Sequence, residues 1–257
     1  MPGQNEQDNG KKVIFVHPHS VIREGLISVI VKYEFEVYLL DDHQQAAKAA
    51  KFFPDSIIFI NLDDGLSEPQ WEEYIRGLMD SEETAGLKIG ILSYNEDANL
   101  AQKYLMDIMV PCGFIKLKLG LVESTKILLK TLEVNEAKGR RKYVRATCGD
   151  SSKATFNIKL KTGIHSGQVI DISAAGMACT FDDDVALKVG TVIDDIQLRL
   201  KGTLCRAGGK LAGINQGEIN RYVIMFGSEV DDANLQKIHS FVHSALQESL
   251  TKTLSKG

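Results

Sequence analysis

Two groups of polar residues in the second half of the chain have the types and spacing of a ligand site. Arg141 and Arg145 are four residues apart and follow Arg140, and the segment Asp171-Ile172-Ser173-Ala174-Ala175-Gly176 begins about 30 residues after them. A guanidinium offers a planar fork of donors that grips phosphate and stacks on a purine. A carboxylate accepts hydrogen bonds of the kind that the Watson–Crick edge of guanine donates. These residues therefore predict a site for a ligand with phosphates and guanine rings.

The two groups resemble the two-part signature of the PilZ family, R-x-x-x-R followed by D/N-x-S-x-x-G, whose members bind cyclic di-GMP. The resemblance covers about 110 residues, from Gly139 to about Leu250. It implies a small barrel preceded by an arginine loop that folds over the ligand. The ligand-binding residues that it implies are Arg140, Arg141, Arg145, Asp171, Ser173 and Gly176.

The resemblance also implies a role for each of these residues. Arg141 and Arg145 are expected to grip phosphate and the O6/N7 edge of guanine, which suits the guanidinium fork. Asp171 and Ser173 are expected to meet the guanine from the barrel. Gly176 is expected to supply a positive φ angle or room for the ligand. In this family an arginine at the position of Arg140 tends to accompany an intercalated pair of ligands, so we expect two cyclic di-GMP molecules per chain.

Simpler interpretations stay open for the same residues. The arginines could form a solvated basic linker, Ser173 could cap a turn, and Asp171 could be a turn former. The presence of both groups, in this order and before a region of short strands, favours a ligand site.

The sequence shows no other convincing chemical site. His17, His19 and His43 suggest metal binding or phosphotransfer but are expected to be loop residues, and Asp63-Asp64-Gly65 and Asp182-Asp183-Asp184 are expected to be solvated loops. The four cysteines form no C-x-x-C pair, so we expect buried thiols, no metal and no cofactor. No catalytic set, P-loop or dinucleotide fingerprint is present, so we expect no enzyme.

The bulk composition indicates a soluble two-domain protein. The chain has 257 residues, which allows two domains of ordinary size. No apolar run reaches the roughly 18 residues of a membrane span, and the polar segment Met1 to Gly10 lacks a signal peptide's apolar core, so we expect a cytoplasmic protein without membrane insertion. Residues 1–137 hold 13 Lys+Arg and 22 Asp+Glu, whereas residues 138–257 hold 17 and 12. The basic second half suggests an anionic ligand but is too mild to indicate nucleic acid.

The first half alternates apolar runs with helical patterns. Strands buried on both faces are predicted at Val13–Val16, Val37–Leu40, Ile57–Ile60, Ile89–Leu92 and Phe114–Ile115. Helices are predicted from Ser20 to Val31, over Gln44–Lys51 after the capping residue Asp42, after Ser67, from Asp97 to Met109 and over Leu121–Ala137, where Gly139 is expected to stop the helix. Five strand–helix units predict an α/β doubly wound five-stranded parallel sheet covered on both faces.

This half resembles a response-regulator receiver domain over about 125 residues. The resemblance is carried by Phe15-Val16-His17-Pro18-His19, Pro54-Asp55-Ser56-Ile57-Ile58-Phe59-Ile60, Leu92-Ser93 and Gly113-Phe114-Ile115-Lys116. A working receiver has an acidic pair for Mg²⁺ where His17 and Pro18 stand, and a phosphate-accepting Asp near Ile60 or Asn61. Ser93 and one of Lys116 or Lys118 fit the remaining family positions. Because a hard cation needs oxygen ligands, we expect a pseudo-receiver that is not phosphorylated.

The second half changes to the alternation typical of antiparallel strands. Strands are predicted around Phe156–Leu160 and Ile196–Leu200 and at Val169–Ile172, Met177–Phe181, Thr203–Arg206 and Tyr222–Phe226, with turns at Thr162-Gly163, Gly208-Gly209 and Asn215-Gln216-Gly217. An amphipathic helix capped near Asp231 or Asp232 ends the chain. These elements predict a six-stranded antiparallel β-barrel with a C-terminal helix, as the PilZ resemblance also implies.

We therefore expect a receiver-like domain at residues 1–137 and a PilZ domain at residues 138–257, with 138–147 as linker and ligand-binding loop. The expected function is a cyclic di-GMP receptor whose loop reorients the two domains and acts on an unidentified protein partner. Family outputs include motility, surface attachment and polysaccharide production. The first alternative is a ligand-independent adaptor. A phosphorylation-driven regulator is disfavoured because this sequence lacks the acidic residues it needs, and a nucleic-acid-binding barrel because the strands lack interleaved aromatic residues.

Overall fold

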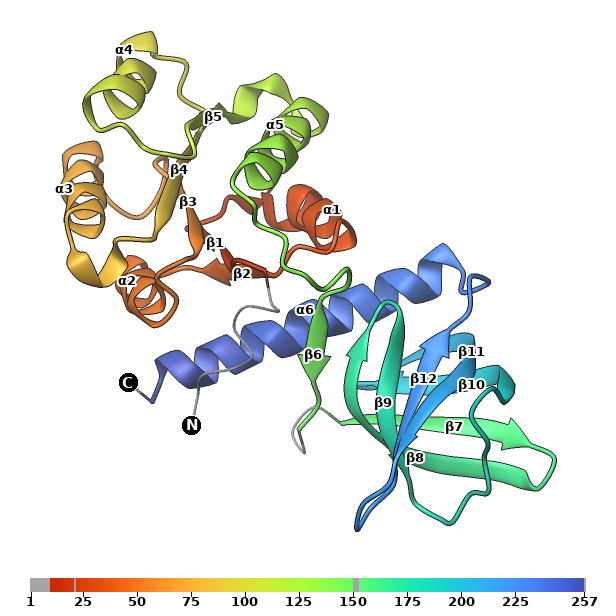
Figure 1. Cartoon of the computed structure of the whole chain (residues 1–257). Coiled ribbons are helices and arrows are strands. Elements are labelled where there is room, and N and C mark those ends of the chain that lie inside the picture. The colour runs from red at the N-terminus through yellow and green to blue at the C-terminus, as the bar shows by residue number, and fades with distance from the viewer. Residues whose placement is uncertain (1–9, 21, 150–152, 257) are drawn as a thin grey trace. The chain divides into compact units, whose positions relative to one another are not determined.

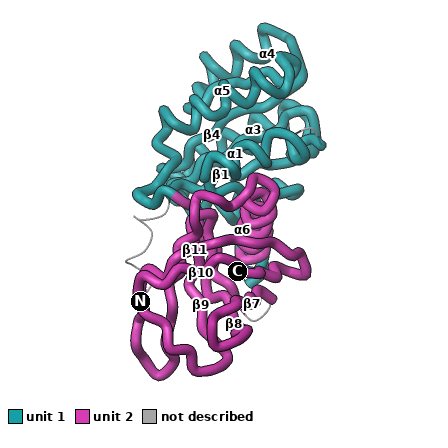
Figure 2. The backbone as a smooth tube through the Cα atoms, turned by 90° about the vertical axis from the view of Figure 1, so that its right-hand side faces the viewer, with its two compact units in different colours: residues 1–142, 250–257 teal, residues 143–249 magenta. Residues whose placement is uncertain are grey.

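The chain folds into two compact units. The computed structural model describes residues 10–20, 22–149 and 153–256, so the polar segment 1–9 and Val21 lie outside the described residues. One unit consists of residues 1–142 and 250–257, and the other of residues 143–249 (Figure 2). Each unit has its own hydrophobic core.

The first unit contains the predicted parallel sheet. Its strands are β1 (Val13–Val16), β2 (Val37–Leu40), β3 (Ile57–Asn61), β4 (Lys88–Ser93) and β5 (Phe114–Lys116). They lie in the order β2-β1-β3-β4-β5, the order of flavodoxin-like doubly wound folds. Helices α1 (Ile27–Lys32) and α5 (Leu121–Val134) cover one face, and α2 (His43–Phe52), α3 (Glu68–Met79) and α4 (Ala98–Gln102) cover the other (Figure 1). The strands are almost wholly buried, as their continuous apolar runs predicted.

The helix starts follow the predicted caps, but two helices are not regular throughout. The Asp42 carboxylate accepts a hydrogen bond from the Gln44 amide at 2.8 Å and starts α2, and Ser67 and Gln70 form a capping box at the start of α3. The helix predicted up to Val31 begins with a π-helical turn at Ile22–Leu26 before α1. Likewise, the helix predicted after Asp97 passes from α4 into a π-helical turn at Lys103–Asp107.

The prediction that Gly139 stops the last helix of this unit is wrong. Helix α5 ends at Val134, and the chain turns at Glu136, which has a positive φ of 53°. The Ala137 amide donates to the Leu132 carbonyl at 3.0 Å and completes the helix end. Gly139 lies against Gly10, where an added Cβ on Gly10 would be 2.7 Å from the Gly139 nitrogen.

The second unit is a closed barrel of six antiparallel strands with one extra strand. The barrel strands are β7 (Ala154–Leu160), β8 (Gly163–Ser173), β9 (Gly176–Phe181), β10 (Val192–Leu200), β11 (Thr203–Asn215) and β12 (Arg221–Phe226). They pair in the order β8-β7-β10-β11-β12-β9, and β9 returns to β8 (Figure 1). The extra strand β6 (Arg145–Thr147) pairs with the end of β8. The predicted barrel is confirmed.

The predicted turn at Gly208-Gly209 is wrong, because both glycines lie inside the long strand β11. An added Cβ on Gly209 would be 2.6 Å from the Met225 carbonyl oxygen, and one on Gly208 would be 3.3 Å from the Asp194 carbonyl oxygen. The glycines therefore allow close approach of β12 and of an irregular stretch of β10, rather than a chain reversal.

The last helix, α6 (Asp232–Leu254), completes the barrel core. Ile238, Phe241 and Val242 pack with the inward residues of the strands in one buried cluster. This is the apolar stripe that the helical spacing predicted. Among the described residues, no helix combines the length and apolar character needed to cross a bilayer.

All four cysteines have free thiols. Cys112, Cys179 and Cys205 are buried, and Cys148, which follows β6, is half-buried.

Candidate ligand-binding site

Four of the six predicted ligand residues lie together on three adjacent strands of the second unit. Asp171 and Ser173 end β8, Gly176 begins β9, and Arg145 begins β6. Arg145 is opposite Ser173 in the β6–β8 ladder, and Ser173 is opposite Gly176 in the β8–β9 ladder. Strand register therefore brings Arg145 to the same edge of the barrel as Asp171, which lies 26 positions later in the chain.

Arg145 and Asp171 form the charged centre of this site. The Arg145 Nε lies 3.4 Å from Asp171 Oδ1, and the two side chains are 49% and 23% exposed. The β8–β9 ladder shifts register between Val169 and Asp171, an irregularity of the kind that re-aims a side chain. An exposed pair of this type contributes only about 0–1 kcal/mol, so the guanidinium and the carboxylate can exchange this partner for a ligand at little cost.

Ser173 holds the turn between β8 and β9. It is buried, its hydroxyl donates to the Gly176 carbonyl at 3.4 Å, and it accepts from the Ala175 amide at 3.3 Å. These two bonds are the turn-capping role that the sequence left open. They position Asp171 and Gly176 on either side of the turn.

One of the two expected reasons for a glycine at position 176, a positive φ angle, is wrong. Gly176 has no positive φ angle. An added Cβ would instead be 2.3 Å from the Ile224 carbonyl oxygen and 3.0 Å from the Met225 Cα. The glycine is needed because β12 passes directly against β9 at this position.

The remaining two residues, Arg140 and Arg141, lie before β6 in the first unit, which extends to Lys142. Both are exposed. Arg140 lines a cleft of its own unit together with Lys138 and Gly139.

The carboxyl edge of the parallel sheet is where a receiver carries its phosphorylation site, and here it is filled by other polar residues. Asn61 ends β3, is buried, and donates from Nδ2 to the His17 carbonyl at 2.8 Å. His17 itself has a positive φ of 48°. Lys118, one of the two lysines that fit the receiver pattern, pairs with Glu96 at 2.7 Å.

Asp63 is a residue of this edge that sequence reasoning missed, because we expected it to be a solvated loop acid. Its carboxylate accepts from the Ser93 hydroxyl at 2.6 Å and from the Tyr94 amide at 2.6 Å. The signal in the sequence was its place two residues after a buried strand, beside the end of β4. Asp63 therefore fastens the loop after β3 to the loop after β4.

Two of the three histidines belong to an aromatic cluster. The rings of His17 and His43 stack with centroids 6.2 Å apart, and both contact Trp71. Burial lowers the pKa of His17, so the ring favours its neutral form. His19 instead packs edge-on against Tyr94. Within the described residues, no group of three or more His, Cys, Asp or Glu side chains is placed to hold a metal ion.

The comparison with protein families concerns the second half of the chain. Residues 139–244 match the family model described as the PilZ domain. This segment is a PilZ domain. The match starts at Gly139, so it includes Arg140 and Arg141 as well as the barrel, whereas the first unit, outside residues 139–142, lies beyond it.

Several solved structures are similar to this chain at low identity. The PilZ domain of YcgR from Escherichia coli, with c-di-GMP, is 17% identical over 44% of this chain and 97% of that chain, with a TM-score of 0.39. The MrkH–c-di-GMP complex of K. pneumonia is 14% identical over 45% of this chain and 57% of that chain, with a TM-score of 0.40. The response regulator RPA3017 of R. palustris is 14% identical over 48% of this chain and 92% of that chain, with a TM-score of 0.39. No curated protein matches the chain.

Proposed function

We propose that the chain is a cyclic di-GMP receptor and not an enzyme. The observation that carries the proposal is the arrangement of Arg145, Asp171 and the Ser173–Gly176 turn on adjacent strands of a PilZ domain, with a further arginine pair directly before β6. Cyclic di-GMP presents two phosphates and two guanines, which match guanidinium donors and a carboxylate acceptor.

In this proposal the ligand replaces the Arg145–Asp171 ion pair. The Asp171 carboxylate accepts from the N–H groups of a guanine, while Arg145 turns to phosphate or to the guanine O6/N7 edge. Ser173 acts through the turn that it holds, although a direct contact is also part of the expected ligand set. Arg141 adds a second guanidinium, and Arg140 a third.

The output follows from the position of the arginines. Arg140 and Arg141 stand in one of the two segments where the chain passes between the compact units, so their capture by a ligand changes the conformations open to that segment. We propose that this change alters the binding of a protein partner that governs motility or surface behaviour. Four free thiols suit the reducing cytoplasm in which we place this receptor.

Calorimetry with cyclic di-GMP on the full chain tests the proposal. We expect saturable binding that Arg145→Ala and Asp171→Ala each weaken, whereas Lys159→Ala, at an exposed position of β7, leaves it unchanged. Absence of binding by the folded wild-type chain would favour the alternative, a ligand-independent adaptor. One observation favours this alternative. At the carboxyl edge of the first unit, Asn61 and Asp63 form hydrogen bonds within the protein, which suits a structural role for that edge.

A further inference from the structure

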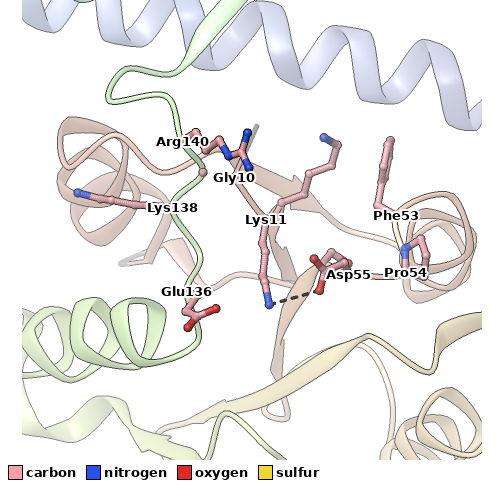
Figure 3. A pocket seen from close by; sticks show the side chains of 11 residues that line it. Gly10, Lys11, Phe53, Pro54, Asp55, Glu136, Lys138 and Arg140 are labelled. Carbon is pink, nitrogen blue, oxygen red and sulfur yellow. Dashed lines mark ion pairs between the residues drawn. The ribbon is translucent and has the colours of Figure 1, made fainter. Parts of the chain in front are cut away.

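A cleft of about 730 Å³ lies at the amino-terminal edge of the parallel sheet, within the first unit. Its floor is formed where the chain enters β1 and β3, and one wall is the segment that follows α5 (Figure 3). This edge is opposite the carboxyl edge at which receiver-like folds bind ligands. The volume is within the range of small-molecule sites. The cleft is therefore at the other end of the sheet from Asn61 and Asp63, and of the expected cyclic di-GMP residues it includes Arg140.

The lining of the cleft carries an excess of positive charge. Four cations, Lys11, Lys12, Lys138 and Arg140, face two carboxylates, Asp55 and Glu136. This composition favours an anionic ligand that also has hydrogen-bond donors.

Most of these cations already have partners. Lys11 pairs with Asp55 at 3.3 Å, and Lys12 pairs with Glu36 at 3.0 Å and lies 4.6 Å from the centre of the Phe53 ring. Lys138 lies 5.0 Å from the centre of the Phe35 ring. Arg140, by contrast, makes no ion pair or hydrogen bond in the part of the chain that the structure describes. Among these four cations, Arg140 is therefore the one most available to an anion.

Two further groups in the cleft lack partners. The Ser56 hydroxyl is 1% exposed and has no hydrogen-bond partner among the described residues. Buried polar groups normally have a partner, so this hydroxyl beneath the cleft is an exception, but it is buried too deeply to be a ligand contact itself. The Glu136 carboxylate likewise makes no ion pair or hydrogen bond within the described ranges, and its backbone is held at a φ of 53°.

The charges are also separated along the cleft. The carboxylates of Glu136 and Asp55 lie on either side of the Lys11 ammonium group, and Arg140 lies at the other end beside Gly10 (Figure 3). We propose that this cleft binds a guanine nucleoside monophosphate. The phosphate meets Arg140, and the N1–H and N2–H₂ donors of guanine meet the carboxylate end. This second site shares Arg140 with the proposed cyclic di-GMP site, whereas Glu136 and Asp55 belong to the cleft alone.

Calorimetry on the full chain, with GMP as the probe, tests the proposal. We expect one GMP per chain, with affinity lowered about 10-fold or more by Arg140→Ala and by Glu136→Gln, because each removes a charge-assisted contact. Lys48→Ala, an exposed lysine on α2 of the same unit, is the matched control and should leave the affinity unchanged.

Three comparisons decide between interpretations. AMP and inorganic phosphate should bind at least 10-fold more weakly than GMP, and equal binding would overturn guanine recognition. Arg141→Ala should retain GMP while it loses cyclic di-GMP, and loss of both would place GMP at the barrel instead. No GMP binding at millimolar concentration, or binding unchanged in Arg140→Ala and Glu136→Gln, would overturn the site. Failure of cyclic di-GMP alone, with GMP binding intact, would overturn only the proposed function.

Discussion

The carboxyl edge of the parallel sheet and the β6–β8–β9 edge of the barrel are both places where strand ends gather polar side chains. In the first, Asn61 donates to the His17 carbonyl and Asp63 accepts from Ser93 and Tyr94. In the second, Arg145 and Asp171 meet at 3.4 Å with substantial exposure. At the first edge the Asn61 and Asp63 side chains are engaged in hydrogen bonds within the protein, and the second edge keeps charge that a ligand can use.

The difference shows that a fold can keep the strand arrangement around a site while hydrogen bonds within the protein occupy the polar groups that would otherwise bind a ligand. The Ser93 hydroxyl is buried, so loss of its hydrogen bond to Asp63 would leave a buried donor unpaired at a cost of roughly 1–3 kcal/mol. An exposed ion pair has no such cost.

Removing one arginine of the barrel site should have the largest effect. Arg145→Ala or Arg141→Ala is expected to weaken cyclic di-GMP binding beyond detection, because we expect each arginine to make more than one charge-assisted contact and each contact to contribute about 1.5–3 kcal/mol, or about 10- to 100-fold in affinity. Calorimetry measures the loss, and circular dichroism should show an intact barrel. Wild-type affinity in either variant would contradict the assignment.

Gly176→Ala should destabilise the barrel rather than act on the ligand directly. Its Cβ would be 2.3 Å from the Ile224 carbonyl oxygen, and overpacking of this kind costs about 1–3 kcal/mol. Gly213→Ala in β11 is the matched control, because its Cβ would meet nothing within 4 Å. Urea unfolding should separate the two variants, and equal midpoints would show that the approach of β12 does not require glycine.

Arg140→Leu should change the ligand count. We expect two cyclic di-GMP molecules per wild-type chain and a value nearer one in the variant, because the third guanidinium neutralises and stacks on an intercalated pair. Calorimetric stoichiometry at ligand concentrations well above Kd measures this. A wild-type value near one would leave Arg140 without a role at the barrel.

Two half-buried histidines should give the stability a modest pH dependence. Burial lowers the pKa of His17 and of His243 on α6, and Nε2 of each is buried without a hydrogen-bond partner among the described residues. Below its histidine pKa of about 6.5, the unfolded chain therefore binds more protons than the folded chain does. The stability that the neutral histidines contribute is fully present above that pH, and the free energy of unfolding falls as the pH drops toward the folded pKa. His243→Leu should flatten this acid slope in urea titrations between pH 7.5 and 5, and an unchanged slope would contradict the assignment.

The smallest effect is expected from acetyl phosphate and Mg²⁺, which should add no phosphate to the wild-type chain. His17 and Pro18 supply no acidic pair, and Asn61 cannot form an acyl phosphate. Mass spectrometry before and after hydroxylamine treatment detects any such adduct. A receiver domain that retains the acidic pair and the phosphate-accepting Asp is the positive control. A hydroxylamine-labile phosphate on residues 1–137 would show that the carboxyl edge is active.

Much of the fold could be predicted because the burial of a strand or helix determines which of its neighbouring residues are apolar. Val13–Val16 and Val37–Leu40 are strands with the predicted bounds, since a strand covered on both faces is a continuous apolar run. Gly208-Gly209 misled the prediction because glycine serves both turns and close strand contacts. β6 is three residues long and has no pattern that could indicate it.

The candidate site was predictable in its residues but not in their contacts. Spacing singled out Arg145 and Asp171, yet their ion pair depends on the register that places β6 beside the end of β8. The partner of Gly176 is on β12, about 50 residues away in the sequence. Such long-range packing leaves no local periodicity, so only the three-dimensional structure reveals it.

The burial of three of the four cysteines makes the chain selective toward thiol reagents. Burial raises the pKa of Cys112 and Cys205 to about 11 and, together with Asp171, that of Cys179 to about 12, so these thiols supply almost no thiolate near neutral pH. Cys148 is half-buried and follows β6 directly, three residues after Arg145. A maleimide fluorophore should therefore attach first beside the arginine site, where its emission can follow ligand binding without an engineered cysteine.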